Sequence, residues 1–499
     1  MKTTKKYIPI LLMLVLLVSC GKDFLNKQPH EFTDAVFWKT AAQAESALAG
    51  VYTPLQGEEA LGGEEWCGIE TFSDNAYMND NYSDYIAMSE FRALENNEGD
   101  LSHNSYVEYY QTIKRATDVL TNVPNITMDA TQQKRILGEA NFLRSFAYYQ
   151  LACRYGGVPI YNSNDPSASL VRATAEKTWE TIETGLKNAT SQLDWNHEEG
   201  RPGLGAAWGM LAKVYAHESK WTDAKTAAEM VINSNKHNLT SNYADIFTIE
   251  HENDSEILWG LGARLGEYPI TPVLMLPNNV WNGLHDEPMG EGWRLVSATL
   301  QFYNSYQAGD LRKAATVAKR GVDVITYNGF TDILQAPNNQ SPVVCIKYNA
   351  PYKISYVGWA AGLNVPALRY ADILLIDVEA IMNLNGGGPA NRSTGVAAAA
   401  VPFNKVRQRA GLPAISAPTF NDFMYERRME LAFEGGDRHF DLVRWGLAAE
   451  VYNALPAEGT YKPKRTYVPA THKLLPYPQA EIDNSNGTIT QNPGYAGGK

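Results

Sequence analysis

A pair of amphipathic helices joined by a short turn constrains the fold of this chain most strongly. Trp208, Leu211 and Tyr215 recur at three- and four-residue spacing, and a second set of alanines follows after a break. Such spacing places apolar side chains on one face of each helix. We therefore predict a helix pair over 204–233 that turns near Lys220.

This spacing approximates the tetratricopeptide pattern, although Ala212 and Ala228 replace its Gly and its Phe. Helix pairs of this kind bury their apolar faces by stacking on neighbouring pairs, so more than one should be present. Further helices are predicted over 38–55, from about 106, over 137–151 before the Gly156-Gly157 pair, and over 370–383 and 397–410 around a Gly-Gly-Gly-Pro breaker.

Two long segments lack a helical period. Residues 56–104 are acidic and aromatic, and residues 243–365 are rich in Gly, Pro, Asn and Trp with short β-like runs such as 343–348. We predict a mainly α protein, in which a tetratricopeptide-like scaffold carries an irregular, loop-rich subdomain with short β hairpins. The expected division is a leader over 1–19, a tether over 20–33, an N-terminal helical part over 34–242, a capping subdomain over 243–365 and a C-terminal helical part over 366–499.

The N-terminus has the order of a secretory signal peptide. Three lysines precede an apolar run over 7–18, which is shorter than the about 20 residues that a membrane-spanning helix needs. The sequence Leu17-Val18-Ser19-Cys20-Gly21 then resembles the lipobox of bacterial lipoproteins, whose Cys is acylated. We predict a chain that is anchored through Cys20, without a membrane-spanning helix, on a membrane that it does not cross.

Charge and cysteine content disfavour a nucleic-acid-binding protein and a metal site built from cysteines. The chain has 43 Lys+Arg against 55 Asp+Glu, a net charge of −12 that disfavours nucleic-acid binding. Beyond Cys20, the cysteines at 67, 153 and 345 are widely spaced, so they allow at most one disulfide and disfavour a thiolate metal site.

Eight short motifs follow one another along the chain in a fixed order. They are the lipobox with 23–25, the run 139–160, the repeat 204–215, and 365–372, 404–407, 426–445 (ERRMELAFEGGDRHFDLVRW), 474–478 and 492–495. Together they resemble the SusD/RagB family of outer-membrane lipoproteins from Bacteroidetes. The resemblance implies a tetratricopeptide-like fold on the cell surface, a SusC-like TonB-dependent transporter as partner, an oligosaccharide or, in some branches, a peptide ligand, and no enzyme activity.

Aromatic side chains flanked by polar ones indicate a sugar site in the two irregular segments. A sugar ring offers apolar C–H faces bordered by hydroxyls, so its binder needs aromatic platforms beside amides, carboxylates or guanidinium groups. For Trp281 and Trp293, the alternative to sugar binding is that they pack in the small core of the loop-rich subdomain. The candidates are Asn75, Tyr77, Asn79, Asp80, Tyr82, Tyr85 and Arg92 in the first segment, and Tyr268, Asn278, Asn279, Trp281, Asn282, Asp286, Trp293 and Arg294 in the second.

The densest ionisable cluster lies in the motif over 426–445 and includes Glu426, Glu430, Glu434 and His439. It allows an acid–base interpretation, but we favour a structural ion-pair network, with the three glutamates spaced along one helix. A glycosidase built on two distant carboxylates remains the main enzyme alternative.

No cofactor is predicted. The oxygen-rich stretch over 79–84 lacks the Gly and the terminal Glu of an EF-hand, so a turn is favoured over a calcium site and no metal site is predicted.

Overall fold

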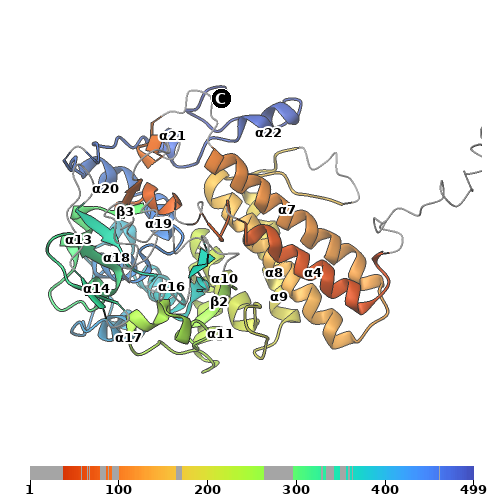
Figure 1. Ribbon diagram of the computed structural model, residues 1–499, viewed down its shortest axis with the longest axis horizontal. Coiled ribbons are helices and arrows are strands. Elements are labelled where there is room, and N and C mark those ends of the chain that lie inside the picture. The colour runs from red at the N-terminus through yellow and green to blue at the C-terminus, as the bar shows by residue number, and fades with distance from the viewer. Residues whose placement is uncertain are drawn as a thin grey trace, which may run out of the picture.

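The computed structural model describes most of the chain, and the architecture is drawn in Figure 1. The described residues are 37–57, 59–63, 66, 68–78, 86–87, 89–92, 100–163, 171–262, 296–327, 330–332, 342–348, 356–357, 360–361, 363–459 and 461–498.

Four helices form one end of the molecule (Figure 1): α4 (Ala41–Leu55), α7 (Asp100–Asn122), α8 (Ala130–Tyr155) and α9 (Ala175–Gln192). Their boundaries follow from capping chemistry, since Thr40, Asp129 and Thr174 each accept a backbone N–H of the first turn. The predicted long helix ends at Gly156, whose φ of 74° is a conformation that suits glycine.

The predicted helix pairs are confirmed. The first is α10 (Leu204–His217) with α11 (Trp221–Ile232), and the second is α16 (Tyr370–Leu384) with α17 (Ala400–Arg409). Gly209 allows α10 to lie close to its neighbours, because a Cβ there would stand 2.8 Å from a methyl carbon of Ile373 on α16. The mainly helical, tetratricopeptide-like fold follows from this stacking.

Short helices and two-stranded ribbons lie with the helix pairs in the rest of the molecule, mostly on the left of Figure 1, and the last short helix lies at the top above α7. The helices are α13 (Leu300–Ser305), α14 (Arg312–Thr316), α18 (Phe420–Leu431), α19 (Asp437–Arg444), α20 (Ala448–Ala454), α21 (Pro469–His472) and α22 (Gln479–Asn484). The antiparallel ribbons pair β1 (Ala76–Met78) with β3 (Val296–Ala298), β2 (Ile257–Leu261) with β10 (Val365–Arg369), β4 (Val317–Lys319) with β7 (Val343–Cys345), β5 (Ile325–Tyr327) with β6 (Phe330–Asp332), and β8 (Tyr356–Val357) with β9 (Ala360–Ala361).

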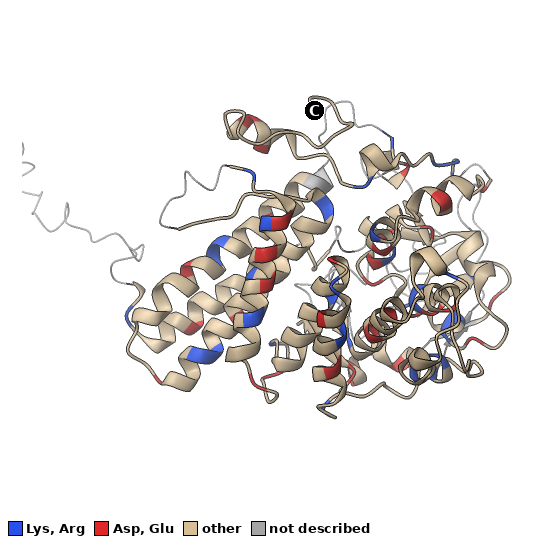
Figure 2. Ribbon diagram, turned by 180° about the vertical axis from the view of Figure 1, so that it is seen from behind, with Lys and Arg blue, Asp and Glu red and all other residues tan. Residues whose placement is uncertain are grey.

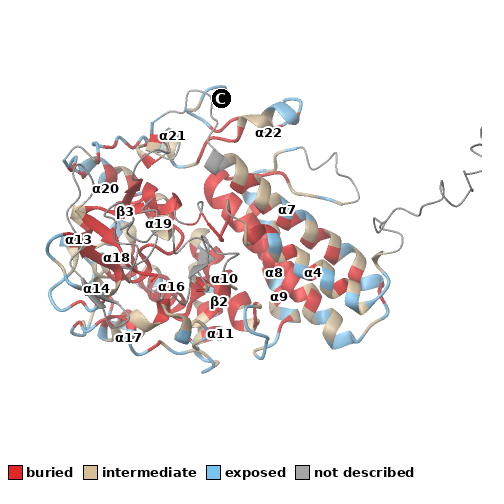
Figure 3. Ribbon diagram, viewed as in Figure 1, coloured by how far each residue is buried: buried red, intermediate tan, exposed pale blue. Residues whose placement is uncertain are grey.

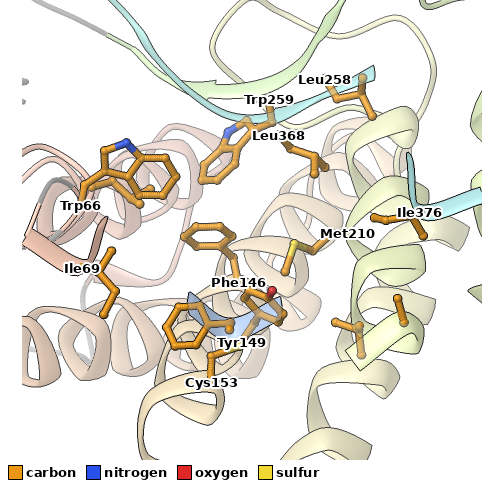
Figure 4. Packing of buried hydrophobic residues seen from close by; sticks show 14 of the residues in the cluster. Trp66, Ile69, Phe146, Tyr149, Cys153, Met210, Leu258, Trp259, Leu368 and Ile376 are labelled. Atoms are coloured by element: carbon orange, nitrogen blue, oxygen red, sulfur yellow. The ribbon is translucent and has the colours of Figure 1, made fainter. Parts of the chain in front are cut away.

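One hydrophobic core connects the helical layers with the ribbons. Trp259 on β2 packs edge-on against Phe142 and Phe146 of α8, with ring centroids 5.0 and 4.9 Å apart (Figure 4). Leu258 and Leu368 continue this contact toward α10 and α16. Figure 3 shows buried residues running through both halves, and the ribbons β1–β3, β2–β10 and β4–β7 are part of the core.

Cys153 and Cys345 are buried free thiols, so neither takes part in a disulfide. Cys67 lies outside the described residues. Within the described part of the chain, no helix is long and apolar enough to cross a membrane.

Candidate functional site

The two segments that carry the predicted sugar-binding residues meet at one ribbon: the first begins at β1, and the second ends at β3. β1 pairs with β3 in the register Ala76 to Ala298 and Met78 to Val296. Met78 directly precedes Asn79, and Val296 follows Arg294 after a single residue. We call this ribbon, β1 with β3, the base of the two segments. The fold therefore joins two segments that lie far apart in the sequence.

Most predicted binding residues lie outside the described residues. They are Cys20, Asn79, Asp80, Tyr82, Tyr85, Tyr268, Asn278, Asn279, Trp281, Asn282, Asp286, Trp293 and Arg294.

Asn75 lies in the described part of the chain. It is fully buried between Glu70 and Arg428, so its amide is occupied by the protein itself.

Tyr77 and Arg92 are, besides Asn75, the predicted contacts that the structure describes. Tyr77 is only 4% exposed, and its ring stacks on Tyr461 at a centroid distance of 5.5 Å and an interplanar angle of 30°. The side chain of Arg92 is 59% exposed and pairs with Glu90. Tyr77 thus packs at the base of its segment, whereas Arg92 is available to solvent.

Buried arginines fix the chain just before β1. Arg438 donates to both carboxylate oxygens of Asp74, at 2.9 and 3.2 Å, and Arg428 lies 3.0 Å from the same carboxylate. Burial alone would raise the pKa of Asp74, but Arg428 and Arg438 outweigh burial and hold it well below its usual range. Asp74 is therefore an anion that ties β1 to α18 and α19.

Arg465 holds the same stretch from the other side. Its guanidinium donates to the carbonyl oxygens of Thr71, Ser73 and Ala76 at 2.8, 2.9 and 2.6 Å. These carbonyls extend from the 3-10 helix over Ile69–Phe72 into β1, and the buried guanidinium supplies the donors that water would otherwise provide. The position of β1, and with it the base of the first segment, depends on this contact.

Glu458 and Tyr461 complete the base, and sequence reasoning missed both. The Glu458 carboxylate accepts the Leu300 and Gln301 backbone N–H groups at 2.8 and 3.3 Å, which caps α13 directly after β3. Tyr461 follows in the same turn and lies against Tyr77. No local motif marks this turn, because its role depends on the start of α13, more than 150 residues earlier.

Two buried ion-pair groups lie behind this base, where Figure 2 shows acidic and basic residues interleaved on neighbouring helices. In the first group, Arg369 donates to Glu256 and Glu434 at 2.6 Å each and to Glu430 at 3.0 Å. Burial alone would raise the pKa of Glu430, but Arg409 and Arg369 hold it well below its usual range. These pairs tie β10 to α18.

The second group joins the helix pairs to α19. Arg427 lies 2.5 Å from both Asp372 and Asp441, and Lys213 lies 3.0 Å from Asp372. Arg444 reaches Glu379 of α16 at 2.6 Å. These ion pairs join α10, α16, α18 and α19.

Comparisons with known proteins agree with this architecture. A family model described as "SusD family" matches residues 289–495, and one described as "Starch-binding associating with outer membrane" matches residues 23–216. The chain belongs to the SusD/RagB family. The predicted resemblance is confirmed.

Individual relatives of this SusD-family protein cover nearly its full length. "SusD-like protein P2" of Formosa agariphila is 24% identical over 98% of this chain and 100% of that protein. Surface glycan-binding protein A from Bacteroides thetaiotaomicron in complex with laminarihexaose aligns with a TM-score of 0.75 at 22% identity, covering 90% of this chain and 99% of that one. A laminarin-binding SusD-like protein aligns with a TM-score of 0.76 at 23% identity, over 92% and 100% of the two chains. The solved structures share the fold.

The structural interpretation of the motif over 426–445 is confirmed for this SusD-family protein. Glu426, Glu430 and His439 are at most 3% exposed, and both glutamates are paired with arginines. One detail of the prediction was wrong, because α18 ends at Leu431 and Glu434 is not on it. Phe433, Gly435 and Gly436 have positive φ, and these positions turn the chain into α19.

His439 gives this SusD-family protein a predicted pH dependence. Its Nδ1 lies 3.1 Å from the Tyr452 hydroxyl, and burial, with Arg465 and Arg154, lowers its pKa to about 3. An unfolded histidine titrates near 6.5, so below that pH the unfolded state gains a proton that the folded state excludes. We expect the stability from His439 to be present above pH 6.5 and to fall by about 2–3 kcal/mol by pH 4.5.

The measurement is the free energy of unfolding in urea at pH 7 and pH 4.5. His439→Gln keeps a hydrogen-bonding group and should make the difference smaller by about 2–3 kcal/mol, whereas the exposed His197→Gln should keep the wild-type difference. An unchanged pH dependence in His439→Gln would contradict the assignment.

No group of three or more His, Cys, Asp or Glu side chains in the described part of the chain could hold a metal ion. The stretch over 79–84 lies outside that part, so the prediction of a turn there stays a prediction.

Proposed function

We propose that this protein is a lipid-anchored outer-membrane lipoprotein, facing the cell exterior, that binds an oligosaccharide without cleaving it. It would then pass the ligand to a SusC-like TonB-dependent transporter. The observation that carries the proposal is the β1–β3 pairing, since it joins the bases of the two aromatic, amide-rich segments. Aromatic platforms beside hydrogen-bonding groups suit a sugar ring.

The buried base supports a binding role. Asp74, Arg428, Arg438 and Arg465 hold β1 through charge-assisted hydrogen bonds, which fix geometry better than neutral ones. Binding residues on loops are precise only when a rigid scaffold positions the loops.

Similarity to glycan-binding proteins supports the ligand class. The solved neighbours include one in complex with laminarihexaose and one laminarin-binding SusD-like protein, and both have this fold. A peptide or another nutrient is the second candidate for the ligand, and an anchored glycoside hydrolase is the third.

Affinity electrophoresis with laminarin and other polysaccharides, followed by calorimetry with laminarihexaose, tests the proposal. We expect dissociation constants on the order of micromolar to millimolar, as for a few stacked rings on an open surface. If the protein binds peptides and no polysaccharide, the peptide-binding candidate is favoured. If oligosaccharides are shortened after incubation with the protein, the glycoside hydrolase is favoured.

Trp281→Ala and Trp293→Ala should each weaken binding about tenfold or more, because a tryptophan that contacts a ligand commonly contributes over about 1.4 kcal/mol. Their melting temperatures should stay near the wild-type value. Trp195→Ala, on the turn before α10, is the matched control and should leave binding unchanged. Lower melting temperatures with unchanged affinity would instead mean that these rings are packing residues.

The anchor has its own test. Cys20→Ala removes the thiol that acylation requires, so the protein should leave the outer-membrane fraction and lose incorporation of labelled palmitate. One acyl chain alone gives marginal binding, so stable anchoring needs more than one. Retention of the variant in the membrane fraction would contradict the lipid tether.

A further inference from the structure

A buried carboxyl group lies beside the chain that enters the base. Glu70 is fully buried on the 3-10 helix over Ile69–Phe72, five residues before Asn75. Its Oε1 accepts the Asn75 side-chain N–H at 2.8 Å and the Ser73 hydroxyl at 3.4 Å, and its Oε2 accepts the Gly436 backbone N–H at 3.2 Å. Glu70 therefore connects the chain before β1 with the left-handed turn that leads into α19.

Asn75 extends this contact to both strands of the base. Its Oδ1 accepts the Arg428 Nε–H at 2.7 Å, which leaves its Nδ2 group for Glu70 and fixes the orientation of the amide. Its backbone carbonyl accepts the Thr299 N–H at 2.8 Å, directly after β3. The next residue, Ala76, is the first of β1. The side chain that Glu70 holds thus belongs to the residue that links β1 with the end of β3.

The hydrogen bonds of Glu70 suit an ionised carboxylate, whereas its surroundings favour the neutral acid. Both oxygens accept from N–H groups, which cannot accept a proton in return, so a protonated carboxyl gives up at least one of these bonds. Burial nevertheless raises the pKa of Glu70 to about 7, because the hydrogen bonds and the more distant Lys347 offset it only in part. Among the described residues, no Lys or Arg side chain hydrogen-bonds to Glu70.

The ionisable groups around Glu70 are Lys347 and Cys345 near β7, Arg428 on α18, and Asp437 and His439 on α19. The two cations are bonded to buried carboxylates, and Asp437 is paired with Lys213. Burial raises the pKa of Cys345 to about 12, and burial with nearby arginines lowers that of His439 to about 3, so both stay neutral between pH 6 and 8. Glu70 differs from the charged groups because its hydrogen-bond donors are all neutral.

We propose that Glu70 is a proton-sensitive positioning residue for the binding site. Its ionised carboxylate ties Asn75, and with it the base, to the turn before α19. Protonation releases one of these hydrogen bonds, so the base loosens and ligand affinity falls in mild acid. The effect on affinity rests on the proposed glycan-binding function, whereas the effect on the base does not.

Hydrogen exchange of the detergent-solubilised full-length protein, without ligand, tests the effect on the base. We expect the protection of the β1 and β3 amides, corrected for intrinsic exchange, to fall about three- to tenfold from pH 8 to pH 6, as for one lost hydrogen bond. Glu70→Gln carries a neutral amide at both pH values, so its protection should be low and equal at the two.

Asp377→Asn is the matched control. Burial also raises the pKa of Asp377 to about 7, but this carboxyl lies on α16 and faces charged groups of α11 and α17. The control should therefore keep the wild-type difference. Equal protection of the wild-type base at pH 8 and pH 6 would overturn the inference, and so would a pH difference that Glu70→Gln retains.

The melting temperature at pH 8 separates positioning from a merely structural role. Burial opposes the ionised form of Glu70, so the neutral Glu70→Gln should melt no lower than the wild type while its base exchanges faster. A marked fall in the melting temperature of the variant would contradict the assignment.

Calorimetry with laminarihexaose at pH 8 and pH 6 tests the effect on binding. The wild-type affinity should fall about threefold or more at pH 6, and Glu70→Gln should show this lower affinity at both pH values. Affinity that does not follow the protection of the base would overturn the link to binding. The proposed function fails separately, when the wild-type protein retains no polysaccharide at either pH, and hydrogen exchange then decides the role of Glu70 by itself.

Discussion

Arg369→Met is expected to lower the free energy of unfolding by about 3–5 kcal/mol, the range for breaking a buried ion pair from one side. Arg369 is 1% exposed and is bound to three carboxylates, those of Glu256, Glu430 and Glu434. Methionine fills similar space without charge, so these anions would lose a shared cation that water cannot replace. Urea denaturation at pH 7 measures the effect.

Arg392→Met is the matched control. Arg392 also binds a glutamate, with 2.8 Å to Glu450, but its side chain is 32% exposed and that of Glu450 is 59% exposed. Solvent screens such a pair, so the loss should be no more than about 1 kcal/mol. Equal losses in the two variants would mean that the buried group does not stabilise the fold in the way its geometry indicates.

Asp74→Asn should combine a comparable loss of stability with weaker glycan binding. The change keeps the shape of the side chain but removes the negative charge that Arg428 and Arg438 share. Two buried guanidinium groups would then lack a counter-charge, a loss of about 3 kcal/mol or more. The base of the first predicted binding segment would loosen, so affinity for the proposed glycan ligand should fall as well.

The pH dependence gives this prediction a second readout. The pKa of Asp74 is held below its usual range, so its stabilising effect is present above the unfolded value of about 3.9 and is lost as the pH falls below it. The difference between wild type and Asp74→Asn should therefore shrink toward pH 2. Asp118→Asn, which affects the surface pair with Lys114, is the control and should change neither stability nor binding.

Sequence periodicity predicted the helices because their information is local. The Trp208, Leu211 and Tyr215 spacing identified α10, and the glycines at 156 and 157 identified the end of α8. Periodicity failed at Glu434, because the left-handed turn through Phe433, Gly435 and Gly436 interrupts what looks like a continuous helical charge pattern. A turn of that kind depends on which neighbours satisfy its backbone.

The sequence by itself determined the helical class, the family and which two segments are rich in sugar-binding residue types. The helical class and the two segments follow from spacing and composition along short stretches, whereas the family follows from the ordered motifs that resemble it. Only the tertiary structure decided that the start of the first segment and the end of the second meet in one ribbon, that Asn75 and Tyr77 are buried there, and that Tyr461 stacks on Tyr77. The physical reason is that pairing, burial and charge neutralisation act between groups hundreds of residues apart, and no local pattern records which distant group satisfies which.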